Sequence, residues 1–332
     1  MSRSVDTFVI RAGAFHGPAA ILAGETGRFE RTLRSLQLPS DAEATIDAST
    51  YVKGMSEIVR MAGNENFFVQ AGLDQDIAEL GVFGRAIVSA DTLWEALQTA
   101  SSALKYYQSD SELLIRTYKG RCRIWYFNPF GAKDAKQDIQ YTISLLAKIV
   151  FLARIKSDPE IQIAYPGASA AHFRNNRYAN SIRNSTQGYL EFNDDLLKAK
   201  MLRTDIVRAE VLTRYLDDKK IDPSVLSKKA ELVAGLVRSS FGIAPWSIVD
   251  TCRALGIGQR SLQIQLKDEG TSFRQILRNE RHNEARRMLA LGASIDETAD
   301  AIGFGHRQSF SEAFTDWEGC PPSAYAKPRR GG

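Results

Sequence analysis

Two short polar clusters near the C-terminal end of the chain combine residue types that can hydrogen-bond to DNA base edges. Each cluster follows a glycine and contains an arginine together with amide, imidazole or hydroxyl side chains. The first consists of Gln259, Arg260, Ser261 and Gln263, and the second of His306, Arg307, Gln308 and Ser311. Arginine pairs bidentately with guanine and glutamine with adenine, which suits these types to sequence readout. Taken by itself, such composition is more typical of a solvated polar helix face, and it is the helix-turn-helix context of these residues that favours base readout.

The two clusters occupy matching positions in an internal repeat. Segments 247–260 and 294–307 share Ser, Ile, Thr, Ala, two glycines and the final Arg in the same order. The opening serine can cap a helix, and the first glycine can end it in a left-handed conformation. These positions are Ser247 and Gly256 in the first copy, and Ser294, Gly303 and the capping-box residue Glu297 in the second. Each copy therefore predicts a short helix, a turn and a second helix, the order of a helix-turn-helix.

One helix is expected between the copies, from about Ser272 to Leu291, because apolar residues recur there at helical spacing. A single rigid helix could hold two such units on successive major-groove faces, roughly 34 Å apart. The aromatic residues of the second copy are expected to form its core. They are Phe304, Phe310, Phe314 and Trp317.

The C-terminal hundred residues resemble the AraC/XylS family of bacterial transcription regulators. The resemblance runs through residues 255–263, 269–273 and 301–325. It implies a seven-helix DNA-binding domain with two helix-turn-helix units. Residues 75–200 resemble the effector-sensing N-terminal domain of one branch of that family, which is arabinose-binding-like, through stretches 81–84, 92–97 and 189–192.

The chain departs from the family pattern at the start of both predicted reading helices. Gly258 and Gly305 stand where members often have serine, which predicts a weaker cap. Several positions where many members carry Arg or Lys are uncharged or acidic here, namely Ile264, Gln265, Thr315 and Asp316. Fewer phosphate contacts predict weaker non-specific binding, and Glu312 and Asp316 would repel phosphates in the second unit.

The N-terminal part mixes helix and strand signals, which predicts an α+β regulatory domain ahead of the all-α C-terminal domain. Helices are expected over 93–107 and 137–156, and mostly helical structure over 17–65. A hairpin is expected over 111–128, with further strands at 161–165 and 188–192. The strands suggest an antiparallel sheet covered on one face. The predicted boundaries are a sensing or self-association domain at 1–216, a linker at 217–228 and the DNA-binding domain at 229–330.

An arginine-rich stretch before the last predicted strand is a candidate effector site. Its candidate ligands are Arg174, Arg177, Arg183 and Ser185. Guanidinium groups pair bidentately with carboxylate or phosphate, so a small anionic effector is predicted. The spacing partly matches a cyclic-dinucleotide motif. An exposed or salt-bridged surface is the alternative reading of the same residues.

Composition and motifs exclude several classes of protein. The chain has 332 residues, which suggests two domains, and its charges nearly balance, with 43 Lys or Arg against 39 Asp or Glu. Three scattered cysteines argue against a disulfide framework or a structural zinc site. No apolar run is long enough for a membrane helix or a secretory signal. We find no catalytic, metal-binding or cofactor-binding motif.

The expectation is therefore a cytoplasmic, sequence-specific transcription regulator that is not an enzyme and uses no cofactor. Its expected partners are double-stranded DNA, RNA polymerase, a small effector and, as a homodimer, a second copy. Alternatives remain for the N-terminal domain, which could be a ligand-free dimerisation module or a catalytic domain. Some DNA-repair alkyltransferases carry an AraC-like segment, but beside a four-cysteine metal site that this chain lacks.

Overall fold

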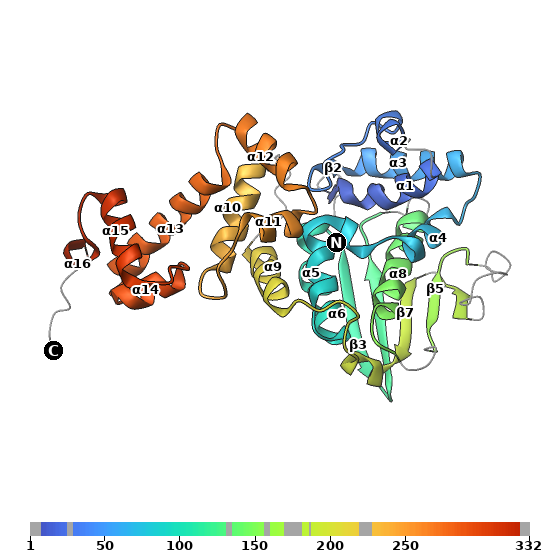
Figure 1. The fold of residues 1–332 in the computed structure, drawn as a ribbon. Coiled ribbons are helices and arrows are strands. Elements are labelled where there is room, and N and C mark those ends of the chain that lie inside the picture. The colour runs from blue at the N-terminus through green and yellow to red at the C-terminus, as the bar shows by residue number, and fades with distance from the viewer. Residues whose placement is uncertain are drawn as a thin grey trace. The chain divides into compact units, whose positions relative to one another are not determined.

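The chain divides into two compact units in the computed structural model (Figure 1). The structure describes residues 8–24, 29–130, 135–155, 160–168, 181–185, 187–218 and 228–325. Unit 1 comprises residues 1–209 with 216–226, and unit 2 comprises residues 210–215 with 227–332. Helix α9 (Ile206–Asp218) contributes to both. Within the predicted linker, residues 219–227 lie outside the described part of the chain.

Unit 1 contains a five-stranded sheet in the order β3-β4-β7-β5-β6. Its strands are β3 (Glu112–Tyr118), β4 (Arg121–Phe127), β5 (Gln162–Tyr165), β6 (Ile182–Asn184) and β7 (Gly188–Asn193). The predicted hairpin is confirmed, and Tyr118 pairs with Arg121 across a turn in which Lys119 and Gly120 both have positive φ. Such turns match the twist of a hairpin. The short strand β6 was not predicted, and it pairs parallel to β5, whereas the other strand pairs are antiparallel.

Helix α8 (Ala135–Phe151) packs along one face of this sheet (Figure 1). The predicted helix over 137–156 is wrong at its C-terminal end. Beyond Phe151 the backbone pairs with a distant segment instead, since the amide of Arg154 donates to the carbonyl of Lys200 at 2.7 Å and that of Leu202 to the carbonyl of Leu152 at 2.8 Å. A tertiary pairing thus overrides the local helical pattern.

Several other helices of unit 1 pack against α8. Thr92 caps α6 (Leu93–Ser102) by accepting from the amide of Glu95 at 3.3 Å, but the helix breaks before α7 (Leu104–Tyr107). The predicted helical region at 17–65 also contains a strand, β2 (Thr45–Asp47), paired with β1 (Val9–Arg11). The other elements are η2 (Ala12–Phe15), α1 (His16–Ala23), α2 (Phe29–Ser35), α3 (Ala48–Ala62), α4 (Phe67–Asp74), η4 (Ile77–Leu80), α5 (Gly81–Ser89) and η7 (Asp194–Lys198).

A buried carboxylate ties several of these elements together. Asp138 of α8 is 1% exposed and accepts hydrogen bonds from the Tyr51 hydroxyl at 2.7 Å, the Tyr126 hydroxyl at 2.8 Å and the Asn128 amide at 2.5 Å. Burial raises the pKa of Asp138, and these three hydrogen bonds oppose that shift. The donors come from α3, β4 and the residue that follows β4, so one side chain fixes the packing of α8 against both.

Unit 2 is helical throughout its described range. Its helices are α10 (Lys229–Ser240), α11 (Ile248–Leu255), α12 (Gln259–Asp268), α13 (Phe273–Ala290), α14 (Ile295–Ala301), α15 (Arg307–Glu318) and α16 (Pro322–Tyr325). The predicted connecting helix is confirmed, with Ser272 as its N-cap and Leu291 as its C-cap. The predicted aromatic core is also present. Phe310 and Phe314 are fully buried beside Leu289, and Phe304 and Trp317 pack against them.

Candidate nucleic-acid interface

Helices α11 and α12 form the first helix pair of unit 2. The Ser247 hydroxyl accepts from the amide of Asp250 at 3.2 Å, and the Asp250 carboxylate accepts from the amide of Ser247 at 3.1 Å. This is a complete capping box, in which two amides without intrahelical partners are satisfied reciprocally. Helix α11 ends at Gly256, which has a φ of +67°. The chain then turns, and α12 begins after Gly258 without a side-chain cap.

Helices α14 and α15 repeat this arrangement. Ser294 accepts from the amide of Glu297 at 3.1 Å and Glu297 accepts from the amide of Ser294 at 2.8 Å, as the sequence predicts. Gly303 follows α14 with a φ of +76°. The predicted start of the second helix at Gly305 is one residue early, because the N-cap of α15 is His306, which also makes no side-chain cap bond.

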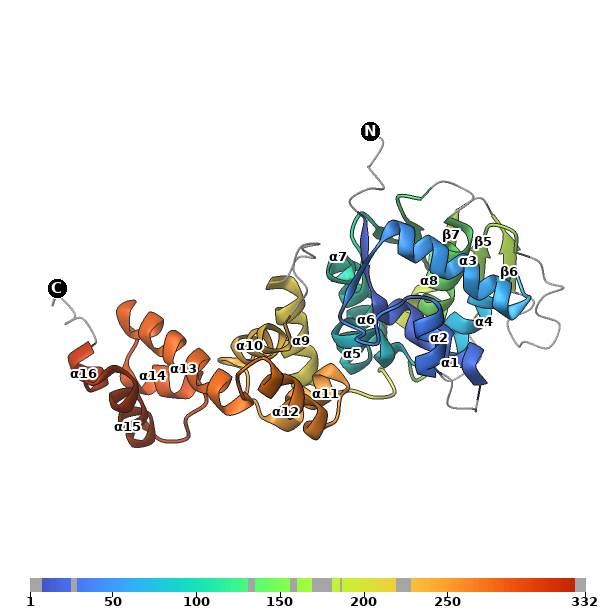
Figure 2. The ribbon, with the colours of Figure 1, turned by 90° about the horizontal axis from the view of Figure 1, so that it is seen from above.

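The predicted base-reading residues lie at the N-terminal turns of α12 and α15. All of them are exposed except Ser311, which is partly buried. Gln259, Arg260, Ser261 and Gln263 therefore present their polar groups to solvent from one end of α12. Figure 2 shows α12 and α15, the helices that carry the two polar clusters, both along the lower edge of unit 2.

The two clusters differ in how far their polar groups are already engaged. Arg260 forms no ion pair with any described residue. In contrast, Arg307 lies 3.1 Å from the Asp296 carboxylate and the Gln308 amide donates to Glu312 at 3.0 Å. The two cluster residues Arg307 and Gln308 and their partners Asp296 and Glu312 are all exposed. A DNA contact by the second cluster would have to displace these partners. In the first cluster, the Ser261 hydroxyl accepts from the Gln265 amide at 3.5 Å, and among the described residues Arg260 has no ion pair to break.

Helix α13 sets the separation of the two helix pairs. It has 18 residues, which at 1.5 Å per residue makes it about 27 Å long. It packs against α10 on the side of the first helix pair, and against α14 and α15 of the second. Arg281 reinforces the second junction, because its guanidinium donates to the carbonyl of Gly303 at 3.0 Å and lies 4.8 Å from the Phe304 ring centroid.

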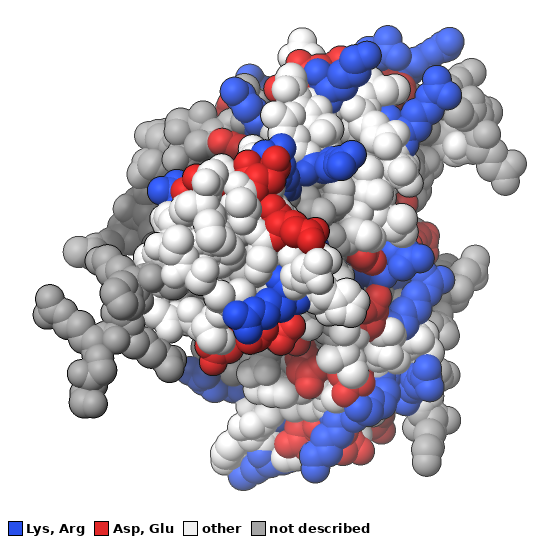
Figure 3. All heavy atoms as spheres, turned by 60° about the vertical axis from the view of Figure 1, so that its left-hand side comes forward, with Lys and Arg blue, Asp and Glu red and all other residues white. Residues whose placement is uncertain are grey.

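Charged residues of both signs are mixed on the surface drawn in Figure 3. Acidic side chains lie among the Lys and Arg side chains instead of forming a separate face. The net charge of +4 is small for a chain of this length. On the face drawn in Figure 3, a nucleic acid would therefore meet individual basic side chains and not a broad basic patch.

The predicted effector residues are only partly described. Arg174 and Arg177 lie outside the described residues. Arg183 is exposed on the edge strand β6, and the Ser185 hydroxyl accepts from the amide of Gln187 at 3.3 Å. The described residues thus place Arg183 and Ser185 at one edge of the sheet.

A cavity of about 320 Å³ elsewhere in unit 1 was not anticipated from the sequence. Its walls combine apolar side chains with charges of both signs. The lining residues are Asp74, Asp76, Ala78, Val88, Lys148, Leu152, Met201, Leu202 and Arg203. Lys148 is half-buried and forms no ion pair with a described residue. These residues come from four separate stretches of chain, so no local sequence pattern could have revealed the cavity.

The described residues contain no cluster of three or more His, Cys, Asp or Glu side chains that could hold a metal ion. The three cysteines are unpaired, and burial raises the pKa of Cys122 to about 12, which keeps this thiol protonated at neutral pH. Among the described helices, none has the length and apolar character needed to cross a membrane.

In comparisons with known proteins, two separate parts of the chain each match a protein family. Residues 251–328 match a helix-turn-helix domain family, and residues 28–174 match the N-terminal arabinose-binding domain of AraC transcription regulators. Over 101 residues the chain is 31% identical to the HTH-type transcriptional regulator YdeO of Escherichia coli, which covers 30% of this chain and 40% of YdeO. Over 100 residues it is 34% identical to the HTH-type transcriptional regulator Rv1395 of Mycobacterium tuberculosis, covering 29% of each.

The match therefore spans less than half the length of either relative. Among solved structures, the transcriptional regulator CdpR of Pseudomonas aeruginosa aligns with 84% of this chain and 90% of its own, at 19% identity and a TM-score of 0.39. The two family matches follow one another along the chain in the order that the sequence motifs predicted. The chain belongs to the AraC family of transcription regulators.

Proposed function

We propose that the protein is a sequence-specific DNA-binding transcription regulator whose two helix pairs, α11–α12 and α14–α15, are both helix-turn-helix units. The observation that carries this proposal is the exposure of two matching polar clusters at the N-terminal turns of α12 and α15, held apart by one helix. N-terminal residues of the second helix are those that reach base edges in this motif.

The dimensions of α13 are compatible with simultaneous binding of both units. Successive major-groove faces on one side of a duplex are about 34 Å apart. Helix α13 is about 27 Å long, which is of the same order as that separation. In this proposal Arg260 and Gln263 contact bases in one groove. His306, Arg307, Gln308 and Ser311 contact the next, with Gln259 and Ser261 assisting in the first.

The proposal is tested by selecting DNA sites with the full-length protein and titrating the selected site at fixed salt. Arg260→Ala should weaken binding by about 1–3 kcal/mol and relax the preference at one base position. Arg116→Ala, which removes an exposed arginine from β3 of unit 1, is the charge-matched control and should bind like the parent. Equal affinity of the Arg260 variant and the parent would contradict the assignment of α12 as a reading helix.

We further propose that a small effector bound to unit 1 controls this regulator. The supporting observation is the 320 Å³ cavity, whose wall residues Met201, Leu202 and Arg203 lead directly into α9. Because residues 210–215 of α9 belong to unit 2, a ligand at this wall touches the segment that continues into the DNA-binding unit. An effector acts only through different affinities for two arrangements of the protein. A second proposed effector site consists of the predicted anion-binding residues Arg174, Arg177, Arg183 and Ser185. Its proposed ligand is a small anion, with a cyclic dinucleotide as one candidate.

Thermal unfolding of the full-length protein with a panel of metabolites separates the possible roles of unit 1. Saturable stabilisation by one compound supports an effector sensor, since a ligand of the native state stabilises it by mass action. Stabilisation that depends only on protein concentration would support a ligand-free dimerisation module, and turnover of a compound would support an enzyme. RNA polymerase is a further proposed partner, tested by transcription from a template that carries the selected site.

A further inference from the structure

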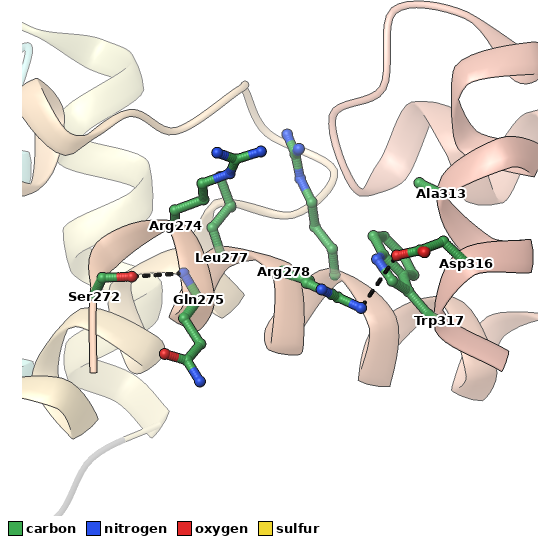
Figure 4. Close-up of a pocket in the computed structure, with 9 residues that line it drawn as sticks. Ser272, Arg274, Gln275, Leu277, Arg278, Ala313, Asp316 and Trp317 are labelled. Atoms are coloured by element: carbon green, nitrogen blue, oxygen red, sulfur yellow. Dashed lines mark hydrogen bonds and ion pairs between the residues drawn. The ribbon is translucent and has the colours of Figure 1, made fainter. Parts of the chain in front are cut away.

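A groove of about 510 Å³ lies between the N-terminal half of α13 and helix α15 (Figure 4). Its lining includes Leu277, Ala313 and Trp317, which form an apolar floor, together with polar side chains of both helices. The groove belongs entirely to unit 2, and α13 leads from the first helix pair to the second. The groove therefore lies along the helix that joins the two helix pairs.

Three arginines of α13 line this groove. Arg274, Arg278 and Arg281 are spaced by four and three residues, which places them on one face of the helix. Arg274 is exposed and forms no ion pair with a described residue. Arg281 is held deeper, on Gly303 and Phe304, and its buried Nε has no hydrogen-bond partner among the described residues. The guanidinium groups of Arg274 and Arg281 are therefore not fully paired with described residues of the protein.

Arg278 has one anionic partner, and this partner comes from the other helix. Its guanidinium donates to the carboxylate of Asp316 on α15 at 3.2 Å (Figure 4). Both side chains are well exposed, at 56% for Arg278 and 71% for Asp316. Ion pairs between such exposed side chains contribute little to stability because water and salt compete for both partners. Another anion of suitable geometry can therefore replace Asp316.

We propose that the groove binds a phosphate of the DNA backbone between the two major-groove contacts, and that Asp316 is an internal competitor for Arg278. The proposal rests on the proposed DNA-binding function. When two units occupy successive major grooves, the intervening stretch of backbone faces the helix that joins them. Arg274 and Arg278 then pair with phosphate oxygens, and Asp316 lowers the affinity by occupying one cation and by repelling the phosphate.

The test uses full-length variants titrated with the selected DNA site over a range of salt concentrations. Arg278→Gln should weaken binding and reduce the slope of log K against log salt by about 0.9, the value for one phosphate contact. Asp316→Asn should tighten binding by about two- to fivefold, since it releases an exposed ion pair and removes a repulsion. Neither change should alter the preferred sequence, because phosphate contacts carry no base information.

The double variant decides whether Asp316 acts through Arg278. In the Arg278→Gln background, Asp316→Asn should give at most a small gain. Glu312→Gln is the matched control, because Glu312 is an acidic residue one turn away that does not line the groove. Its effect should be the same with and without Arg278. Thermal unfolding of each variant checks that the fold is retained.

The outcomes separate this inference from the proposed function. If the parent protein shows no saturable DNA binding, or if that binding does not depend on Arg260, the DNA-binding proposal itself is overturned. Sequence-specific binding with an unchanged salt slope in Arg278→Gln would overturn only the phosphate site. An equal gain from Asp316→Asn with or without Arg278 would overturn the role of Asp316 as a competitor.

Discussion

Asp138 shows how one residue can determine the packing of unit 1. Its carboxylate is buried and depends on hydroxyl and amide donors from residues distant in sequence, Tyr51, Tyr126 and Asn128. Because burial raises its pKa above the usual 3.8, the folded state favours the protonated form more than the unfolded state does. Its contribution to stability is therefore largest below that usual value and is lost as the pH rises through the raised pKa.

We expect Asp138→Asn to flatten this pH dependence. The free energy of unfolding of the parent should fall as the pH rises from 3.8 through the raised pKa of Asp138, relative to that of the variant. Urea unfolding at a series of pH values measures this difference. Asp195→Asn, at an exposed position of η7, is the control. Parallel curves for parent and Asp138→Asn would refute the linkage.

The two polar clusters also differ in the ion-pair and hydrogen-bond partners of single residues. Arg260 is free of described ion-pair partners, whereas Arg307 is paired with Asp296 and Gln308 with Glu312. An arginine that must first break an ion pair with a carboxylate contributes less net free energy to DNA binding than an arginine without such a partner. The first unit is therefore the stronger anchor of the proposed DNA complex, and the second contributes mainly by extending the site.

At the scale of secondary-structure elements, the turn between α14 and α15 depends on one glycine and not on its neighbour. Gly303 has a φ of +76°, and a Cβ atom there would meet the Arg281 guanidinium at 3.3 Å. Gly305 does not have a positive φ, and a Cβ atom there would meet nothing within 4 Å. The two positions are two residues apart but tolerate a side chain very differently.

Gly303→Ala should therefore destabilise unit 2 by more than about 1 kcal/mol, because alanine is strained at positive φ. Gly305→Ala should be neutral or stabilise by up to about 1 kcal/mol, since it restricts only the unfolded chain. Hydrogen exchange of α14 and α15 in the full-length variants measures both effects. Similar protection in the two variants would show that the left-handed turn is not required.

The elements of unit 2 were largely predictable, and those of unit 1 were less so. Capping boxes, glycine turns and the apolar spacing of α13 are local patterns, complete within a few residues. The early end of α8 and the strand pair β1–β2 depend on backbone partners far away in the chain. Local sequence cannot show which distant backbone will compete for the same hydrogen bonds.

At the scale of the whole molecule, α9 is the element through which the two units can communicate. The cavity wall at Met201–Arg203 precedes it, the amide of Asp205 donates to the carbonyl of Ser89 at 3.0 Å, and residues 210–215 belong to unit 2. A ligand that displaces residues 201–203 can therefore shift α9 only if the chain between these residues and α9 is stiff.

Insertion of Gly-Ser-Gly between Arg203 and Thr204 should abolish the effect of an effector on DNA binding. Affinity for DNA without effector should stay close to that of the parent, because the insertion touches neither reading helix. The same insertion after Gly120, in the β3–β4 turn, is the control and should preserve the response. DNA titrations with and without a stabilising metabolite measure both, and a response retained by the first insertion would place the coupling elsewhere.

The sequence by itself determined the duplicated helix pairs, the connecting helix, the aromatic core and the positions of the two polar clusters, since these follow from hydrogen bonds and apolar spacing within short segments. Only the tertiary structure decided which residues oppose one another. The pairing of Arg278 with Asp316, the donors around Asp138 and the walls of the 320 Å³ cavity all join distant segments. Their energies depend on burial and on partners that exist only once the chain has folded.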